Sequence, residues 1–275
     1  MRDDPVVTQR STDLEAPGHG LDYGKMPGHW LLAQMGKRVL RPGGVELTSR
    51  MLEALDICST DEVVEFAPGL GLTARAALER QPASYTGIER DETASRQVGK
   101  YLKGPGRQCL VGRAEATGLP DASATVVFGE AMLSMQTPIL KASIVEEAAR
   151  LLRPGGRYGV HELCLQPDDL EDAKKSEISR VLSDAIRVGA RPLTPGEWKA
   201  LLEDHGFAVE TQVTAPMHLM EPRRFIRDEG WARTIRFVLK VARTPAARRR
   251  ILRMRAVFRE YAGNLAAITL VGVKK

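Results

Sequence analysis

A chain of 275 residues can hold one large α/β domain with insertions, or two small domains. Its 43% hydrophobic and 27% charged residues are ordinary for a globular protein, and no apolar run is long enough to span a membrane. The net charge of +5 is modest and excludes no class of partner by itself.

The N-terminus and the cysteines predict the compartment. Met1-Arg-Asp-Asp-Pro5 lacks the apolar core of a secretory signal. Cys58, Cys109 and Cys164 show no C-x-x-C spacing, which argues against a disulfide framework and a zinc site. We therefore expect a cytoplasmic protein that binds no metal and is not integral to a membrane.

The first 57 residues predict an arm followed by two helices. Residues 1–24 are polar and rich in proline and glycine, as in a loose arm. From Pro27 to Leu55 the apolar spacing is helical, with a break at Arg41-Pro-Gly-Gly44. Arg41 beside this turn could bind a carboxylate bidentately, although a simple turn between two helices explains the break as well.

Residues 62–74 predict a strand, a glycine turn and the start of a helix. The apolar strand covers 63–66, and the helix covers 73–80. Glycines let a ligand lie against the backbone, and the unpaired N–H groups at the helix start face that ligand. This pattern is typical of a corner that binds a nucleotide-type cofactor, and a tight turn without a ligand is the alternative. The residues that would face the ligand are Glu65, Ala67, Gly69 and Gly71.

A second carboxylate supports the cofactor interpretation. The next predicted strand, 85–89, ends at Glu89, twenty residues after Gly69. In doubly wound folds an acidic side chain at this point accepts hydrogen bonds from ribose hydroxyls. Nicotinamide dehydrogenases and S-adenosylmethionine (SAM) methyltransferases both use this arrangement, so the pattern up to Glu89 leaves both open.

The rest of the chain continues the alternation of strands and helices, which predicts a parallel sheet with right-handed crossovers. Thr194-Pro-Gly-Glu197 has the spacing of a helix capping box, and Gly206 is a typical stop. The expected helices cover 92–101, 138–152, 168–190 and 195–205, and the expected strands cover 108–111, 125–129, 157–163, 207–213 and 265–273.

Residues 147–161 identify a family. A helix end, the turn Leu151-Leu-Arg-Pro-Gly-Gly156 and a new strand resemble the class I SAM-dependent methyltransferases, particularly the small-molecule branch with the ubiquinone and menaquinone methyltransferases. The resemblance runs from about Leu47 to Val213 and resumes at the C-terminus. It implies SAM as cofactor and a Rossmann-like, doubly wound α/β sheet of seven strands that ends in an antiparallel hairpin.

The resemblance and the fifty-residue insertion that interrupts it together predict three parts. Residues 1–57 would form the arm and a helical cap, residues 58–213 and 265–275 the SAM-binding domain, and residues 214–264 a helical lid inserted before the last strand. Thirteen basic residues lie between 223 and 259, opposed by Asp228 and Glu229. They could meet nucleic acid, an anionic membrane surface or an acidic substrate, and a solvated helix face explains them most simply.

The resemblance assigns roles on the cofactor side. Glu65 would face the methionine amino group, Glu89 the ribose diol, and Arg90 the adenine. The family usually has an Asp after the third strand that meets the adenine, and this chain has Arg113 there. Ala114 and Glu115 follow, so Glu115 or a backbone carbonyl would replace that contact, or the contact is lost. Glu130 would contact the sulfonium side or the acceptor; an exposed loop carboxylate is the alternative.

A catalytic base is harder to assign. His161, near the end of the fifth strand, could take a proton from an acceptor hydroxyl, because imidazole titrates near neutral pH. A core histidine bonded to the backbone is the alternative. His29 and His218 could also reach the cavity, and many members of the family use no base.

We therefore expect a methyltransferase that acts on a small, fairly apolar or quinone-like acceptor by O-, C- or N-methylation. Gly129-Glu-Ala-Met132 differs from the tetrapeptide of nucleobase and glutamine methyltransferases. The alternatives are an RNA methyltransferase that uses the basic insertion, an NAD-dependent oxidoreductase, and a non-catalytic SAM-binding protein. Nucleic acid is the less favoured partner, and a homodimer is left open.

Overall fold

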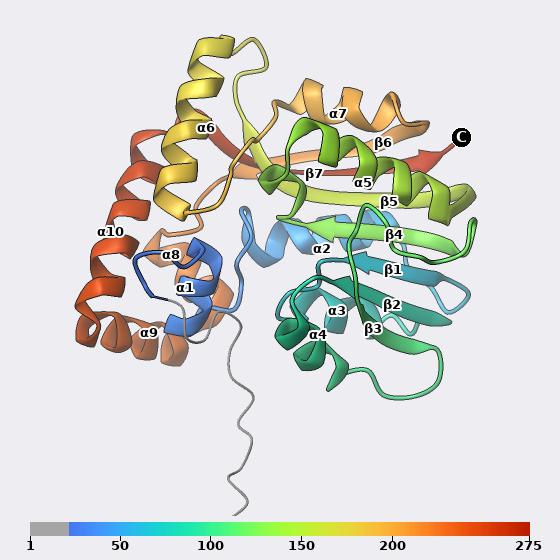
Figure 1. Ribbon diagram of the computed structural model, residues 1–275, viewed down its shortest axis with the longest axis horizontal. Coiled ribbons are helices and arrows are strands. Elements are labelled where there is room, and N and C mark those ends of the chain that lie inside the picture. The colour runs from blue at the N-terminus through green and yellow to red at the C-terminus, as the bar shows by residue number, and fades with distance from the viewer. Residues whose placement is uncertain (1–21) are drawn as a thin grey trace, which may run out of the picture.

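A seven-stranded mixed sheet forms the centre of the computed structural model, which describes residues 22–275 (Figure 1). The strand order is β3-β2-β1-β4-β5-β7-β6, and β7 runs antiparallel to both of its neighbours. The predicted Rossmann-like sheet with its final hairpin is therefore confirmed. Almost all of the predicted arm lies outside the described residues. The strands are β1 Glu62–Phe66, β2 Ser84–Glu89, β3 Arg107–Val111, β4 Ala124–Glu130, β5 Leu152–Leu165, β6 Phe207–Pro216 and β7 Leu265–Lys274.

Helices cover both faces of the sheet, as the alternation of strands and helices requires. One face packs against α2 (Gly44–Leu55), α3 (Leu72–Leu78) and α4 (Glu92–Gly99), with Leu55 and Ala77 in its core. The other face packs against α5 (Pro138–Leu151) and α7 (Pro195–Glu203), with Trp198 fully buried. Because α2 lies on the sheet, it contributes to the same core as the strands.

A second core lies beyond the carboxyl ends of the parallel strands. Figure 1 shows its helices together on the left, beside the sheet. Leu31, Phe225, Phe237 and Met254 from four different helices meet there. Its helices are α1 (Gly28–Met35), α6 (Asp172–Ile186), α8 (Pro222–Glu229), α9 (Trp231–Arg243) and α10 (Pro245–Glu260). The last three lie between β6 and β7, in the segment that the sequence analysis assigns to a lid; the division into domains stays a prediction.

Two local predictions have different outcomes. The capping box at the start of α7 is confirmed, because the Thr194 side chain bonds the Glu197 backbone and the Glu197 side chain bonds the Thr194 backbone. The fifth strand begins earlier than expected, at Leu152 and not after Gly156. Leu152 already pairs with Ala124, and Arg157 pairs with Val126. The turn between Leu152 and Arg157 forms a bulge within the strand, in which Gly155 has a φ of +77°.

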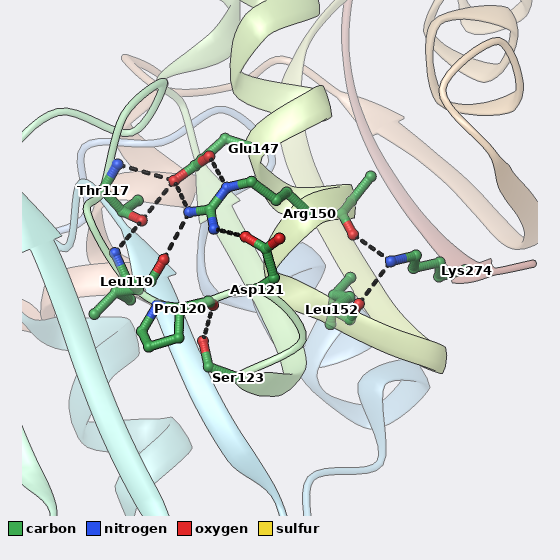
Figure 2. A network of polar contacts seen from close by, with 10 residues as sticks. Thr117, Leu119, Pro120, Asp121, Ser123, Glu147, Arg150, Leu152 and Lys274 are labelled. Atoms are coloured by element: carbon green, nitrogen blue, oxygen red, sulfur yellow. Dashed lines mark hydrogen bonds and ion pairs between the residues drawn. The ribbon is translucent and has the colours of Figure 1, made fainter.

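The loop between β3 and β4 is fixed to α5 by a polar network (Figure 2). Arg150 on α5 pairs with Asp121 and donates to the Leu119 carbonyl, while Glu147 accepts from the Thr117 backbone. Hydrogen bonds from Arg150, followed by those from Thr117, outweigh burial and lower the pKa of Glu147 to about 2. This network holds the loop that begins with residues 112–115, one wall of the cavity described next.

Candidate cofactor and acceptor site

A cavity of about 520 Å³ lies between the carboxyl ends of the parallel strands and helices α1, α6 and α10. Its volume is in the range of ligand-binding pockets, and its position is where open α/β sheets bind ligands. The predicted cofactor residues that line it are Glu65, Ala67, Gly69, Glu89, Arg90, Ala114, Glu115 and Glu130. Two predicted site residues do not line the cavity: Gly71, which precedes α3, and His161, which lies within β5.

The turn after β1 opens onto this cavity. Gly69 has a φ of +56°, and a Cβ added there would meet nothing closer than the Ala67 carbonyl at 3.9 Å. The space over Gly69 is therefore free for a ligand. Ala67 adopts a φ of +53°, a conformation that costs an alanine about 1 kcal/mol. At Gly71 a Cβ would lie 3.2 Å from Tyr101 and Val98, so this glycine allows helix packing and not ligand approach.

Glu89 ends β2 with its carboxylate facing the cavity. Its Oε2 accepts a hydrogen bond from the Gly69 N–H and its Oε1 accepts one from the Asp91 N–H, both at 2.9 Å. Burial raises the pKa of Glu89, and the backbone hydrogen bonds oppose that effect. Each carboxylate oxygen keeps acceptor capacity. The side chain can therefore bind a diol while its own position is fixed by the glycine turn.

Glu65 lies deeper, at 3% exposure. The Tyr85 hydroxyl donates a 2.6 Å hydrogen bond to its Oε2. Burial is the main reason that its pKa rises to about 8, and the neighbouring Glu130 adds to the rise. At neutral pH the side chain is therefore mostly protonated until a cation approaches it.

Glu130 is the centre of a buried cluster at the end of β4. Its Oε1 accepts from Thr48 and His161 at 2.6 Å each, and its Oε2 accepts from Thr73 and lies 3.3 Å from the Arg41 guanidinium. Burial would raise its pKa, but Arg41, His161 and Thr48 outweigh burial and hold the pKa at about 2. Its side chain is only 8% exposed, so the alternative of an exposed loop carboxylate is wrong.

His161 occupies the next strand and is fully buried. Its Nδ1 lies 2.6 Å from Glu130, and its Nε2 lies 2.6 Å from the Pro42 carbonyl oxygen. Both nitrogens therefore face acceptors, and neither directs a lone pair at the cavity. This geometry favours a core histidine, the alternative to a general base. The role of His161 as a base stays a prediction.

The rim near the expected adenine site is charged. Arg113 and Glu115 form an ion pair with each other, and Arg90 is exposed. His29 on α1 also lines the cavity; burial, and then Arg90, lower its pKa to about 4. His29 is therefore neutral at physiological pH. His218 lies in a separate groove between α8 and α10.

Apolar side chains from several other elements also line the cavity, and they were not among the predicted site residues. They come from the segment around η1 (Leu133–Met135), from β5, from α6 and the residues just after it, from the β6–α8 connection and from α10. In the sequence each of them resembles an ordinary core residue. No local signal separates them from the core. They are Met132, Met135, Leu163, Leu182, Ile186, Val188, Met217, Leu219, Met254 and Phe258.

Comparisons with known proteins agree with this geometry. Residues 64–160 match the model of a family described as "Methyltransferase domain". A protein of Haemophilus influenzae described as uncharacterized is 31% identical over 219 residues, covering 77% of this chain and 84% of that protein.

Solved structures show the same fold. A putative sarcosine dimethylglycine methyltransferase from Galdieria sulphuraria superimposes with a TM-score of 0.65 at 14% identity, over 84% of each chain. Phosphoethanolamine N-methyltransferase 2 of Haemonchus contortus, in complex with S-adenosyl-L-methionine, gives a TM-score of 0.66 at 15% identity, over 90% of this chain and 56% of that one. SAM is the cofactor of this methyltransferase domain. Glu65, Gly69 and Glu89 line the cavity, and their roles toward SAM stay predictions. The chain belongs to the class I SAM-dependent methyltransferases.

Proposed function

We propose that this methyltransferase acts on a small apolar or quinone-like acceptor bound in the apolar part of the cavity. The observation that supports this proposal most is the set of ten apolar side chains named above, which line the cavity. Apolar walls with few polar groups favour a ligand that is itself mostly apolar. Glu162 lines this part, but its oxygens already accept from the backbone of Met132, Leu133 and Ser134 and from the Ser134 hydroxyl.

The residues of the opposite part are suited to hold the cofactor. In this proposal Glu89 accepts from the ribose hydroxyls, Glu65 accepts from the amino group, and Ala67 and Gly69 provide the surface beneath the ligand. Bound SAM supplies an activated methyl group on a sulfonium, so the protein mainly aligns the acceptor with it. Gly71 acts indirectly, because it lets α3 begin close to Tyr101.

Arg41 supports this arrangement from the cap. Its Nε lies 3.3 Å from the Glu130 carboxylate, and within residues 22–275 this buried Nε makes no hydrogen bond. Its side chain is 12% exposed and lines the cavity. We assign to it the carboxylate of the cofactor, which a guanidinium can bind with two parallel hydrogen bonds.

The proposal includes no protein base. His161 has both nitrogens occupied, Glu130 has a pKa of about 2, and His29 lies beside Arg90 and Asp91 on the cofactor side. Among the described residues of the apolar part, none is a histidine or lysine. An acceptor whose reacting atom is already nucleophilic, such as an acidic hydroxyl that ionises in solution, suits this site.

Residues 214–264 act as a lid in this proposal. Met217, Leu219, Met254 and Phe258 all come from this segment and line the apolar part. Residues that close over the acceptor also exclude water from the methyl group.

Methyl transfer to a panel of compounds tests the proposal. The purified chain is incubated with methyl-labelled SAM and with phenols, quinols, amines and RNA, and products are identified by mass spectrometry. We expect label on an apolar hydroxyl or ring carbon, and Met254→Ser and Phe258→Ser should raise the acceptor KM without changing the Kd of SAM. Transfer to RNA, or to polar amines alone, would contradict the proposed acceptor class.

A further inference from the structure

Helix α9 exposes an apolar stripe that the second core does not use. Trp231 is 70% exposed, Ile235 55%, Val238 57% and Leu239 46%. Their spacing places them on one side of the helix. The inward side of the helix is already packed, because the Phe237 ring lies 4.5 Å from that of Phe225. A contiguous exposed stripe of large apolar side chains marks an interaction surface.

A row of basic residues runs beside this stripe. Arg233, Arg236, Lys240 and Arg243 follow one another at spacings of three or four residues, and all four are exposed. No acidic residue occurs from 230 to 259 in the sequence. The next helix adds Leu252, which is 55% exposed, with Arg248, Arg249 and Arg253 around it.

We propose that the outward face of α9 lies on the surface of an anionic lipid bilayer. The apolar stripe would enter the boundary between headgroups and acyl chains, and the basic row would contact lipid phosphates. Within residues 22–275 no helix is long and apolar enough to cross a bilayer. Figure 1 shows α9 at the lower edge of the helical group, away from the sheet.

The charge and the apolar stripe of this face argue against a second copy of the chain and against nucleic acid as its partner. A second copy would bring two identical basic rows together, and like charges across an interface oppose association. Nucleic acid would match the charge, but its phosphates gain nothing from an aliphatic stripe, and a stacking surface needs several aromatic rings where this stripe has one. An anionic bilayer matches the charge and the apolar stripe together. This inference does not depend on the identity of the acceptor.

Vesicle binding by the full chain tests the proposal. We expect co-sedimentation with phosphatidylcholine vesicles that contain about 30% phosphatidylglycerol, and at least about tenfold weaker binding to phosphatidylcholine alone. Binding to the anionic vesicles should weaken at about 0.5 M salt. Tryptophan emission should shift to the blue on binding, and Trp231→Ser should remove most of that shift, since Trp198 is already buried and Trp30 is partly buried beside the cavity.

Variants on the helix separate the two contributions. Trp231→Ser combined with Ile235→Ser, and Arg233→Glu combined with Arg236→Glu, should each lower vesicle partitioning about tenfold or more. Matched controls are Ile139→Ser, at a side chain 81% exposed on α5, and Lys100→Glu with Lys103→Glu. Circular dichroism and SAM affinity confirm that each variant is folded.

Three outcomes would overturn the proposal. The first is that the wild-type chain does not bind anionic vesicles. The second is that both α9 variants bind as well as the controls. The third is that another partner covers α9 and vesicles do not bind. That partner would be a second copy of the chain, if Ile235→Ser dissociates a dimer, or RNA, if RNA binding survives the apolar double variant.

Discussion

The imidazole of His161, within β5, and the carboxylate of Glu130, at the end of β4, lie 2.6 Å apart. The two residues are direct partners in the register of β4 and β5, so the sheet itself places them together. Glu130 in turn binds Thr48, Thr73 and Arg41, which belong to α2, α3 and the cap. His161 therefore positions a carboxylate that joins the cap to the strand ends.

Replacing His161 tests this positioning role. His161→Ala leaves a buried carboxylate short of one partner and should cost about 3–5 kcal/mol of unfolding free energy. Because Arg41 loses its fixed neighbour, SAM affinity should fall as well. Thermal unfolding and calorimetric SAM titration measure the two effects, with His218→Ala as the control in the separate groove.

The general-base hypothesis for His161 makes a different prediction. It requires kcat to fall by about 10²–10⁴-fold in His161→Ala while stability and SAM affinity hold. A stable variant with those properties would restore His161 to the chemistry and contradict the positioning role.

The sheet and the cofactor corner could be predicted because their signals are local. A strand, a glycine turn and a carboxylate at the next strand end lie within 28 consecutive residues, from Glu62 to Glu89. The beginning of β5 could not be predicted, since Pro154-Gly-Gly resembles a loop and only the pairing of Leu152 with Ala124 shows that the strand has started.

The Glu130 cluster and the apolar wall were beyond prediction for a physical reason. The partners of Glu130 are spread from Arg41 to His161, and only the packing of α2 on the sheet brings them together. The wall residues bury apolar surface whether they face a ligand or a core. Sequence periodicity reports burial and cannot tell these two environments apart.

Glu89→Ala should weaken SAM binding by about 1–3 kcal/mol, because the ribose hydroxyls and the Gly69 N–H lose their acceptor. Glu89→Gln, which keeps one oxygen, should weaken it less. Isothermal titration measures both. Glu92→Ala, at an exposed carboxylate on the adjoining helix, is the control. Unchanged affinity in a folded Glu89→Ala protein would remove this residue from the cofactor site.

Arg250 should stabilise the contact between α10 and the start of the cap. Its guanidinium donates to the carbonyls of Tyr23 and Met26 at 2.7 and 2.6 Å, and to that of Ala185 at 3.3 Å. Arg250→Ala should cost about 1–3 kcal/mol of unfolding free energy. The exposed neighbour Arg249 offers a matched control, and Arg249→Ala should change stability by less than about 0.5 kcal/mol. Equal denaturation midpoints for the two variants would show that the contact contributes little.

Glu65 should make the protein less stable in alkali. Its folded pKa of about 8 lies above the unfolded value of 4.5, so the folded state favours the protonated form. The contribution to stability is fully present below the unfolded pKa and is lost as the pH rises through about 8. Glu65→Gln mimics the protonated acid. It should melt at a higher temperature than wild type near pH 9 and at a similar temperature near pH 5, and the opposite order would contradict the raised pKa.

The same raised pKa predicts that SAM binding releases a proton. In the free protein near pH 7, Glu65 is mostly protonated, because burial outweighs the hydrogen bond from Tyr85. If Glu65 accepts from the cationic amino group of SAM, that cation lowers its pKa and the carboxyl ionises on binding. Titration calorimetry in buffers of different ionisation enthalpy should therefore show release of up to about one proton per SAM bound. Glu65→Gln should bind without this release, while Glu92→Ala should keep it. A wild-type protein that binds SAM with no proton release at pH 7 would place the amino group elsewhere in the cavity.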